Sequence, residues 1–195
     1  MFYKFLNNIS IILILLLGVS LTTIGQTSDP VLKYNVVYND GDYSGQYLEA
    51  EKVLYSEVNF YRERHGLSAL VLNETTVNYA CRWGYYMMEK HVDVTNNFYQ
   101  HSKFGGAEYQ IPSTTSEIIH LVYFDHYPSV TEAVSALMYG INRGPDHSIL
   151  GWTQSEPHNL CLTQSIAKYY GCSIFVEKKG VWFVLYGVVN MSCVY

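Results

Sequence analysis

Charged residues are scarce in this sequence. Only 15% of the 195 residues are Asp, Glu, Lys or Arg, and 12 basic against 17 acidic residues give a net charge of −5. A protein that binds nucleic acid needs a basic patch or stripe that neutralises phosphates. Because the chain offers no such stripe, its composition argues against a nucleic-acid partner.

The sequence also lacks an apolar run long enough to cross a bilayer. Near its start, the run IILILLLGV covers only residues 11–19, whereas a spanning helix needs ~20 apolar residues. A basic residue before this run and the small Gly25 after it are typical of an export signal. We therefore expect a signal peptide over residues 1–25, an extended segment over 26–46 and one domain over 47–195, in a secreted or periplasmic protein with no stable membrane span after signal removal. Retention of the signal as an anchor is the alternative.

Three motifs of metal and catalytic sites are absent. There is no C-x-x-C pair for a thiolate metal site or redox centre, no H-E-x-x-H zinc motif, and no G-x-S-x-G turn around a nucleophilic serine. The four cysteines are widely spaced, and export favours their oxidation. We therefore expect disulfide bonds, with three pairings open, among Cys81, Cys161, Cys172 and Cys193.

The chain does contain periodic apolar segments. Their periods predict helices over residues 47–65, 74–91 and 129–142, and an antiparallel hairpin over 171–189 with its turn at 178–180. Gly84 lies inside the second helix, where Gly costs ~1 kcal/mol relative to Ala, so we expect it to allow close packing. Helices that precede the clearest strands indicate an α+β fold.

The stretch GWTQSEPHNL indicates the start of a fourth helix. Ser155 is expected to cap it by accepting a backbone N–H, and Pro157 suits a first turn whose N–H groups have no helical partner. The positive end of the helix dipole keeps His158 neutral, with a lone pair for a metal ion or a proton. A hydrogen-bonded structural histidine is the alternative. One face of this helix is predicted to carry His158, Leu162, Ser165 and Tyr169.

Several segments follow one another in an informative order: VNFYRERHGLSAL, QHSKFGGAEY, SEII, GWTQSEPHNL and GVWFVLYGVV. This series resembles the CAP superfamily, in its bacterial-type branch; the superfamily comprises the cysteine-rich secretory, antigen 5 and pathogenesis-related proteins. The resemblance covers about residues 47–189. The matching residues are Asn59, Arg62, Gly66, Leu67, Leu70, Ala80, His101, Glu117, Ile118, Trp152, Ser155, His158 and Gly171.

The resemblance implies a fold and a site. The fold is an α-β-α sandwich of the α+β class, with a small three-stranded antiparallel sheet between helices. The site is a cleft that contains His101, Glu117 and His158. Many eukaryotic members have a second Glu before the second His, but Ser155 stands at about that place here, with Glu156 beside it. The four-residue cleft is therefore incomplete in this chain.

Two imidazoles and a carboxylate suit Zn²⁺ or another divalent cation, because three protein ligands leave a position for water or substrate. Glu117 is expected either to bind the ion or to accept an imidazole N–H and orient the ring. One alternative is a metal-assisted peptidase or esterase that acts through Glu117 and a metal-bound water. Another is a cleft that binds an extracellular lipid, glycan or protein without chemistry. In the absence of a hydrolase motif, a binding module is favoured over an enzyme.

The remaining histidines are expected to be structural, with one exception. His65 and His91 are placed at helix C-termini, where the dipole favours positive charge, and His120 and His126 are expected to be exposed or hydrogen-bonded. His147 is the alternative to His158 as the second imidazole of the cleft, because both lie in the segment between helices. The W-x-x-S-x-x-H spacing favours His158.

Overall fold

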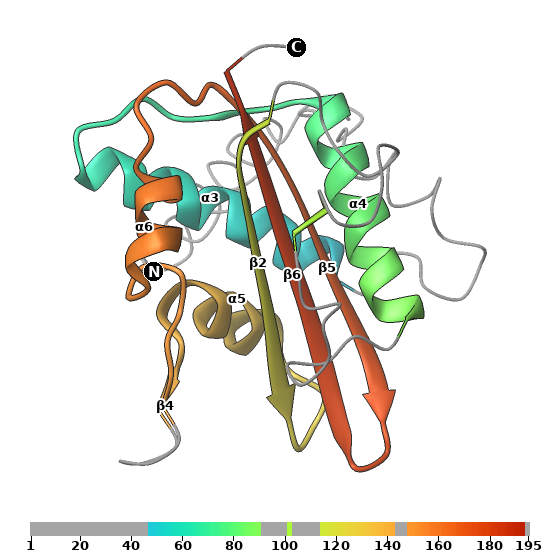
Figure 1. The fold of residues 1–195 in the computed structure, drawn as a ribbon. Helices are drawn as coiled ribbons and strands as arrows, with labels where there is room; N and C mark the ends of the chain where they lie inside the picture. The colour runs from blue at the N-terminus through green and yellow to red at the C-terminus, as the bar shows by residue number, and fades with distance from the viewer. Residues whose placement is uncertain (1–46, 91–100, 103–113, 143–147, 194–195) are drawn as a thin grey trace, which may run out of the picture.

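A four-stranded sheet forms the centre of the molecule (Figure 1). The structure is a computed structural model, which describes residues 47–90, 101–102, 114–142 and 148–193. The strands lie in the order β1 (Val71–Leu72), β5 (Tyr169–Lys179), β6 (Trp182–Ser192) and β2 (Thr114–Phe124). β5, β6 and β2 are antiparallel, as expected, but β1 pairs parallel to β5. The expected number of three strands is therefore corrected to four; β1 is too short to give a period in the sequence.

Helices cover both faces of the sheet, which confirms the expected α+β class and α-β-α sandwich (Figure 1). One face packs against α4 (Glu74–Glu89), and the other against α3 (Leu48–Arg64), α5 (Val130–Tyr139) and α6 (Glu156–Leu162). A small ribbon of β3 (Ile141–Asn142) and β4 (Ser148–Ile149) follows α5. Each face of the sheet thus has its own layer of buried side chains.

The β5–β6 hairpin supplies the two central strands. Successive side chains point to opposite faces, so Ile174 and Leu185 pack in the α3 and α5 layer, whereas Phe175 and Tyr186 pack in the α4 layer. Strands covered on both faces are apolar almost throughout, which explains why the sequence predicts this hairpin clearly. Its turn contains Gly180, whose φ of +62° is a left-handed conformation that favours glycine.

Gly84 lets α4 approach β5 closely, as predicted. A Cβ at this position would lie 2.5 Å from Ser173 Oγ and 2.8 Å from Phe175 Cδ2. Ser173 Oγ donates a hydrogen bond to Ala80 O (2.7 Å), one turn earlier on the helix. The helix therefore rests directly on the strand through a position without a side chain.

Side-chain caps fix the starts of α4 and α5. Asn73 Oδ1 accepts a hydrogen bond from the Thr76 N–H (3.1 Å) and so caps α4. Ser129 and Glu132 form a capping box at α5, in which each side chain accepts from the backbone N–H of the other. These contacts satisfy N–H groups that have no partner inside the helix.

The fourth helix is shorter than predicted. α6 ends at Leu162, and Tyr169 is the first residue of β5, so the predicted helical face from His158 to Tyr169 is wrong. Arg62 Nη1 donates to Leu162 O (2.7 Å) and to Gln164 O (3.0 Å). The guanidinium thus takes the place of a further helical turn as the partner of these carbonyls.

The four cysteines all lie within the described residues, and none forms a disulfide bond there. The expected disulfides are therefore not supported. Cys81 is buried on α4 next to Val77, whereas Cys172 belongs to the α3 face of β5, where its Sγ lies 3.7 Å from Glu51 O. Cys161 and Cys193 are partly buried on α6 and after β6. The thiols of Cys81 and Cys172 contribute to the interior as small buried groups, and burial raises the pKa of both.

Some predictions fall on residues that the structure does not describe. These are the signal peptide over 1–25, the segment over 26–46, His91 and His147. Across the ranges that are described, no helix is long and apolar enough to cross a membrane.

Candidate functional site

Glu117 holds His101 and Ser102 at β2, the edge strand of the sheet. Glu117 lies on β2, and its Oε1 accepts hydrogen bonds from the Ser102 N–H (2.7 Å) and from His101 Nδ1 (3.2 Å). The Glu117 side chain is 8% exposed and the His101 side chain 45% exposed. Because a carboxylate only accepts, Nδ1 of His101 carries the hydrogen, and Nε2 of the neutral ring keeps a lone pair.

The second oxygen of Glu117 is engaged as well. Asn190 pairs with Glu117 across β6 and β2. When its amide oxygen accepts from the Ala80 N–H (3.2 Å), its NH₂ group donates to Glu117 Oε2 (3.2 Å). This orientation satisfies both ends of the amide. Glu117 is therefore a fixed acceptor, tied to α4 through Asn190, that orients the His101 ring.

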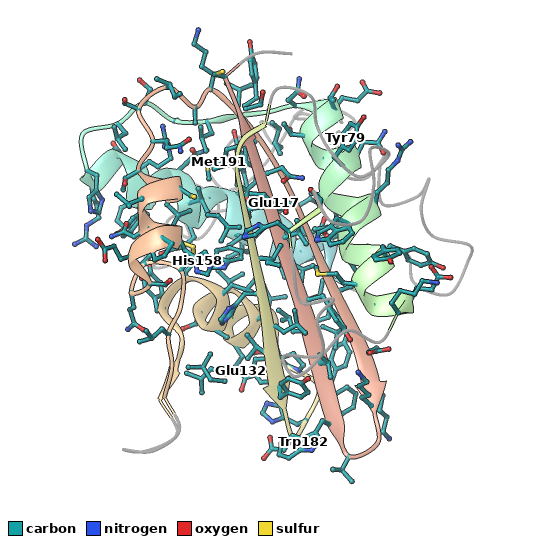
Figure 2. All side chains as sticks on the ribbon, in the orientation of Figure 1. Tyr79, Glu117, Glu132, His158, Trp182 and Met191 are labelled. Atoms are coloured by element: carbon teal, nitrogen blue, oxygen red, sulfur yellow. The ribbon has the colours of Figure 1, made fainter. Side chains whose placement is uncertain are left out.

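His158 reaches the same edge from α6, on the other face of the sheet (Figure 2). Burial lowers the pKa of His158, and the nearby His101 imidazole lowers it further. Its Nδ1 is buried and has no hydrogen-bond partner in the described ranges. Both causes favour the neutral form of His158, and the influence of His101 indicates that the two imidazoles lie near each other.

The start of α6 differs from the prediction in one detail. Ser155 is the N-cap residue and Pro157 lies in the first turn, as expected, but the Ser155 side chain makes no capping hydrogen bond. Glu156 is exposed. No contact among the described residues joins Ser155 or Glu156 to the two histidines, so of the predicted site residues the structure brings together His101, Glu117 and His158.

His120 also lies near the candidate site, although it was not predicted there from the sequence. It lies on β2 and is 8% exposed, and neither of its ring nitrogens has a hydrogen-bond partner among the described residues. Burial lowers its pKa to about 4, and His158 contributes to the lowering. His120 is therefore buried, and the alternative of an exposed His120 is wrong. A signal existed in the alternation of SEIIHLVYF, which puts His120 on the same face as Ile118 and Val122.

The other described histidines lie away from the cleft. His65 follows α3, as expected, and its Nδ1 lies 2.8 Å from Tyr61 O. His126 is exposed and hydrogen-bonded, also as expected, between Asp125 (2.7 Å) and Glu132 (3.0 Å). The interaction with these carboxylates raises the pKa of His126.

A cavity of about 660 Å³ lies at the opposite end of β2 from Glu117. Its lining includes His126, Glu132 and Trp182, and Figure 2 shows the latter two toward the lower end of the molecule, below Glu117 and His158. The cavity is thus separate from the predicted cleft.

Within the described residues, no three His, Cys, Asp or Glu side chains form a group that could hold a metal ion together. The donors that the site does offer are the imidazoles of His101 and His158. Imidazole suits Zn²⁺, Cu²⁺ and Ni²⁺ rather than Mg²⁺ or Ca²⁺. The donor chemistry therefore fits a transition metal that takes further ligands from water or a bound molecule.

Comparisons with known proteins agree with this fold. No curated protein matches the chain. Among solved structures, an outer surface protein of Borrelia burgdorferi is 16% identical, with a TM-score of 0.50 over 76% of this chain and 96% of that one. An extracellular SCP-domain protein of Bacillus anthracis is 12% identical (TM-score 0.39, 72% of this chain and 40% of that one). A cysteine-rich secretory protein of Staphylococcus aureus is 13% identical (TM-score 0.38, 79% and 44%).

The family is identified by a match to a family model. The model of the CAP family, described as the cysteine-rich secretory protein family, matches residues 55–195. This range contains the sheet, α4, α5, α6 and all residues of the cleft. The chain therefore belongs to the cysteine-rich secretory protein family, as the sequence resemblance indicated.

Proposed function

We propose that this CAP-domain protein is an extracellular binding module that holds a divalent metal ion, with Zn²⁺ as the first choice, through His101 and His158. The observation that carries the proposal is the orientation of His101: Glu117 Oε1 accepts from Nδ1 and leaves the Nε2 lone pair for a ligand. Burial keeps His158 neutral, which a metal-binding imidazole requires. The outer surface protein of Borrelia burgdorferi that shares the fold supports an extracellular location.

Binding is favoured over hydrolysis because of the contacts of Glu117. A general base needs an oxygen free to take a proton from water or substrate. Hydrogen bonds already occupy three of the four acceptor sites of the Glu117 carboxylate, two on Oε1 from Ser102 and His101 and one on Oε2 from Asn190. Glu117 is therefore assigned an orienting role. The metal, when bound, supplies a Lewis-acidic centre with positions left for an extracellular lipid, glycan or protein ligand.

Calorimetric titration with Zn²⁺ tests the proposal. We expect wild type to bind Zn²⁺ and to prefer it to Mg²⁺, and the double variant His101→Ala, His158→Ala to lose this binding. His126→Ala is the matched control, because His126 is exposed at the far end of β2. Equal heats for wild type and the double variant would overturn the proposal.

A further inference from the structure

Within the part of the chain that the structure describes, three buried ring nitrogens between β2 and α6 have no hydrogen-bond partner. They are Nδ1 of His158 and both nitrogens of His120. An unsatisfied buried polar atom costs ~1–3 kcal/mol, and such atoms in a native protein call for an explanation, such as a functional role. We therefore look for one explanation of the unpartnered nitrogens in both imidazoles.

The fold places these two rings opposite each other. His120 shares a face of β2 with Ile118 and Val122, which pack in the same layer as Leu162 of α6. Leu162 is one helical turn after His158, so both side chains lie on the same side of α6. The electrostatic influence of His158 on His120 agrees with this placement.

The second nitrogen of a metal-binding imidazole offers this explanation. Such a ring almost always donates its second N–H to a carboxylate, a carbonyl or water, which fixes the tautomer and the ring plane. Glu117 fills this role for His101. Among the described residues, no carboxylate lies at Nδ1 of His158. On the face of β2 toward α6, His120 also has ring nitrogens without a partner there, and an imidazole nitrogen can accept a hydrogen bond.

We propose that His120 is the positioning residue of His158: it accepts, through one buried water, a hydrogen bond from the Nδ1–H of His158 and so directs Nε2 toward His101. The inference rests on the proposed metal-binding function and deepens it. The two metal-binding imidazoles are then oriented from opposite faces of β2, one by a carboxylate and the other by a neutral imidazole.

Three substitutions of His120 test this role. His120→Phe keeps a ring of similar shape but removes the acceptor. His120→Asn and His120→Gln place an amide oxygen near the positions of Nδ1 and Nε2. We expect His120→Phe to weaken Zn²⁺ binding ~10–100-fold, as loss of such partners does, and at least one of the amide variants to stay within a few-fold of wild type.

Two further measurements separate positioning from structure. The metal-free His120→Phe protein is expected to unfold close to the wild-type temperature, because Phe keeps a ring in the interior and removes a buried nitrogen that has no partner among the described residues, while it takes away the proposed acceptor of His158 Nδ1–H. Nitrogen NMR of the imidazoles is expected to show His158 as the Nδ1–H tautomer in wild type and a mixture of tautomers in His120→Phe. His126→Gln serves as the control and leaves both the Zn²⁺ affinity and the His158 tautomer unchanged.

The outcomes distinguish the two proposals. Wild-type protein that does not bind Zn²⁺ overturns the metal-binding function, whereas the His158 tautomer still tests the hydrogen bond. If Zn²⁺ binding occurs but is equal in wild type and His120→Phe, the metal-binding function stands and the role of His120 falls. The role also falls if neither amide variant restores affinity. In that case the shape of the side chain at position 120 matters, and not a hydrogen-bond acceptor.

Discussion

Tyr61 on α3 donates its hydroxyl hydrogen bond to Oδ1 of Asn159 on α6, at 2.9 Å, immediately next to His158. The following residue, Arg62, binds Leu162 O at the other end of the same helix. α6 has only seven residues, and a helix shorter than ~12 residues is marginal alone in water. The position of the His158 imidazole therefore depends on α3, a helix that contributes no side chain to the cleft.

The first prediction concerns Arg62, which is fully buried and donates to Ser68 O, Leu162 O and Gln164 O. Arg62→Met keeps much of the apolar stem but leaves three carbonyls without this donor. We expect a loss of about 3 kcal/mol in the free energy of unfolding, since charged hydrogen bonds contribute ~1.5–3 kcal/mol each and are not additive. Urea denaturation followed by circular dichroism measures it.

The control for this substitution is Arg64→Met on the same helix. Arg64 is exposed, and its guanidinium lies over the Phe60 ring at 5.9 Å. We expect its denaturation midpoint to stay close to wild type. If the midpoints of the two variants coincide, the buried guanidinium does not hold α6.

The second prediction concerns Gly84. Gly84→Ala gains ~1 kcal/mol of helix propensity, but its Cβ would stand 2.5 Å from Ser173 Oγ and 2.8 Å from the Phe175 ring. Overpacking of this kind costs ~1–3 kcal/mol, so we expect a lower melting temperature. Glu89→Ala, at an exposed position of α4, is the control and is expected to be neutral or stabilising. A Gly84→Ala protein as stable as that control would contradict the close packing of α4 on β5.

The third prediction is the effect of removing the charge of Glu117. Glu117→Gln keeps the size of the side chain but weakens the acceptor of the His101 Nδ1–H and the Ser102 N–H. We expect Zn²⁺ affinity to fall ~10–100-fold, the usual effect of losing a group that orients a ligand. Calorimetry provides the measurement. Glu156→Gln, exposed on the first turn of α6, controls for loss of negative charge near the site and should bind as wild type does.

The fourth prediction is a pH window for the ion pair at the start of α5. The Ser129 cap, followed by His126, lowers the pKa of Glu132 from 4.5 to about 2, and Asp125 and Glu132 raise the pKa of His126 above 6.5. A lowered carboxyl pKa stabilises the fold above 4.5, and this contribution is lost as the pH falls toward 2. A raised imidazole pKa stabilises it below 6.5, and this contribution is lost as the pH rises through the folded-state value.

The two conditions overlap between pH 4.5 and 6.5. There the melting temperature of wild type should exceed that of Glu132→Gln by the largest margin, and the margin should shrink on both sides. Because both side chains are exposed, 1 M NaCl should reduce it. A margin that is constant from pH 2 to 8 would rule out the ion pair as its source.

The elements that the sequence predicted well are those whose own residues carry the period. α3, α4 and the β5–β6 hairpin fall within a few residues of their predicted bounds, because each has an apolar face or two covered faces. β2 was not predicted, although SEIIHLVYF is apolar on both faces, since a histidine and a glutamate interrupt the run. The length of α6 depends on the distant Arg62, which no local pattern reveals.

The residues of the site were also predicted only in part. His101, Glu117 and His158 were found through the order of the family segments, and the structure brings them to one edge of the sheet. His120 belongs to none of those segments as a matched residue. Its place in the site arises only because α6 packs over β2, a contact between residues far apart in the chain.

The order of strands also bears on how the protein is made. β5 and β6 occupy the middle of the sheet but are the last of the described elements to be synthesised. Until the ribosome has released them, β2 has no neighbour to pair with, and α4 has no surface for its apolar side. A chain truncated before Tyr169 would therefore expose these segments to aggregation and proteolysis, and folding must await completion of the C-terminal hairpin.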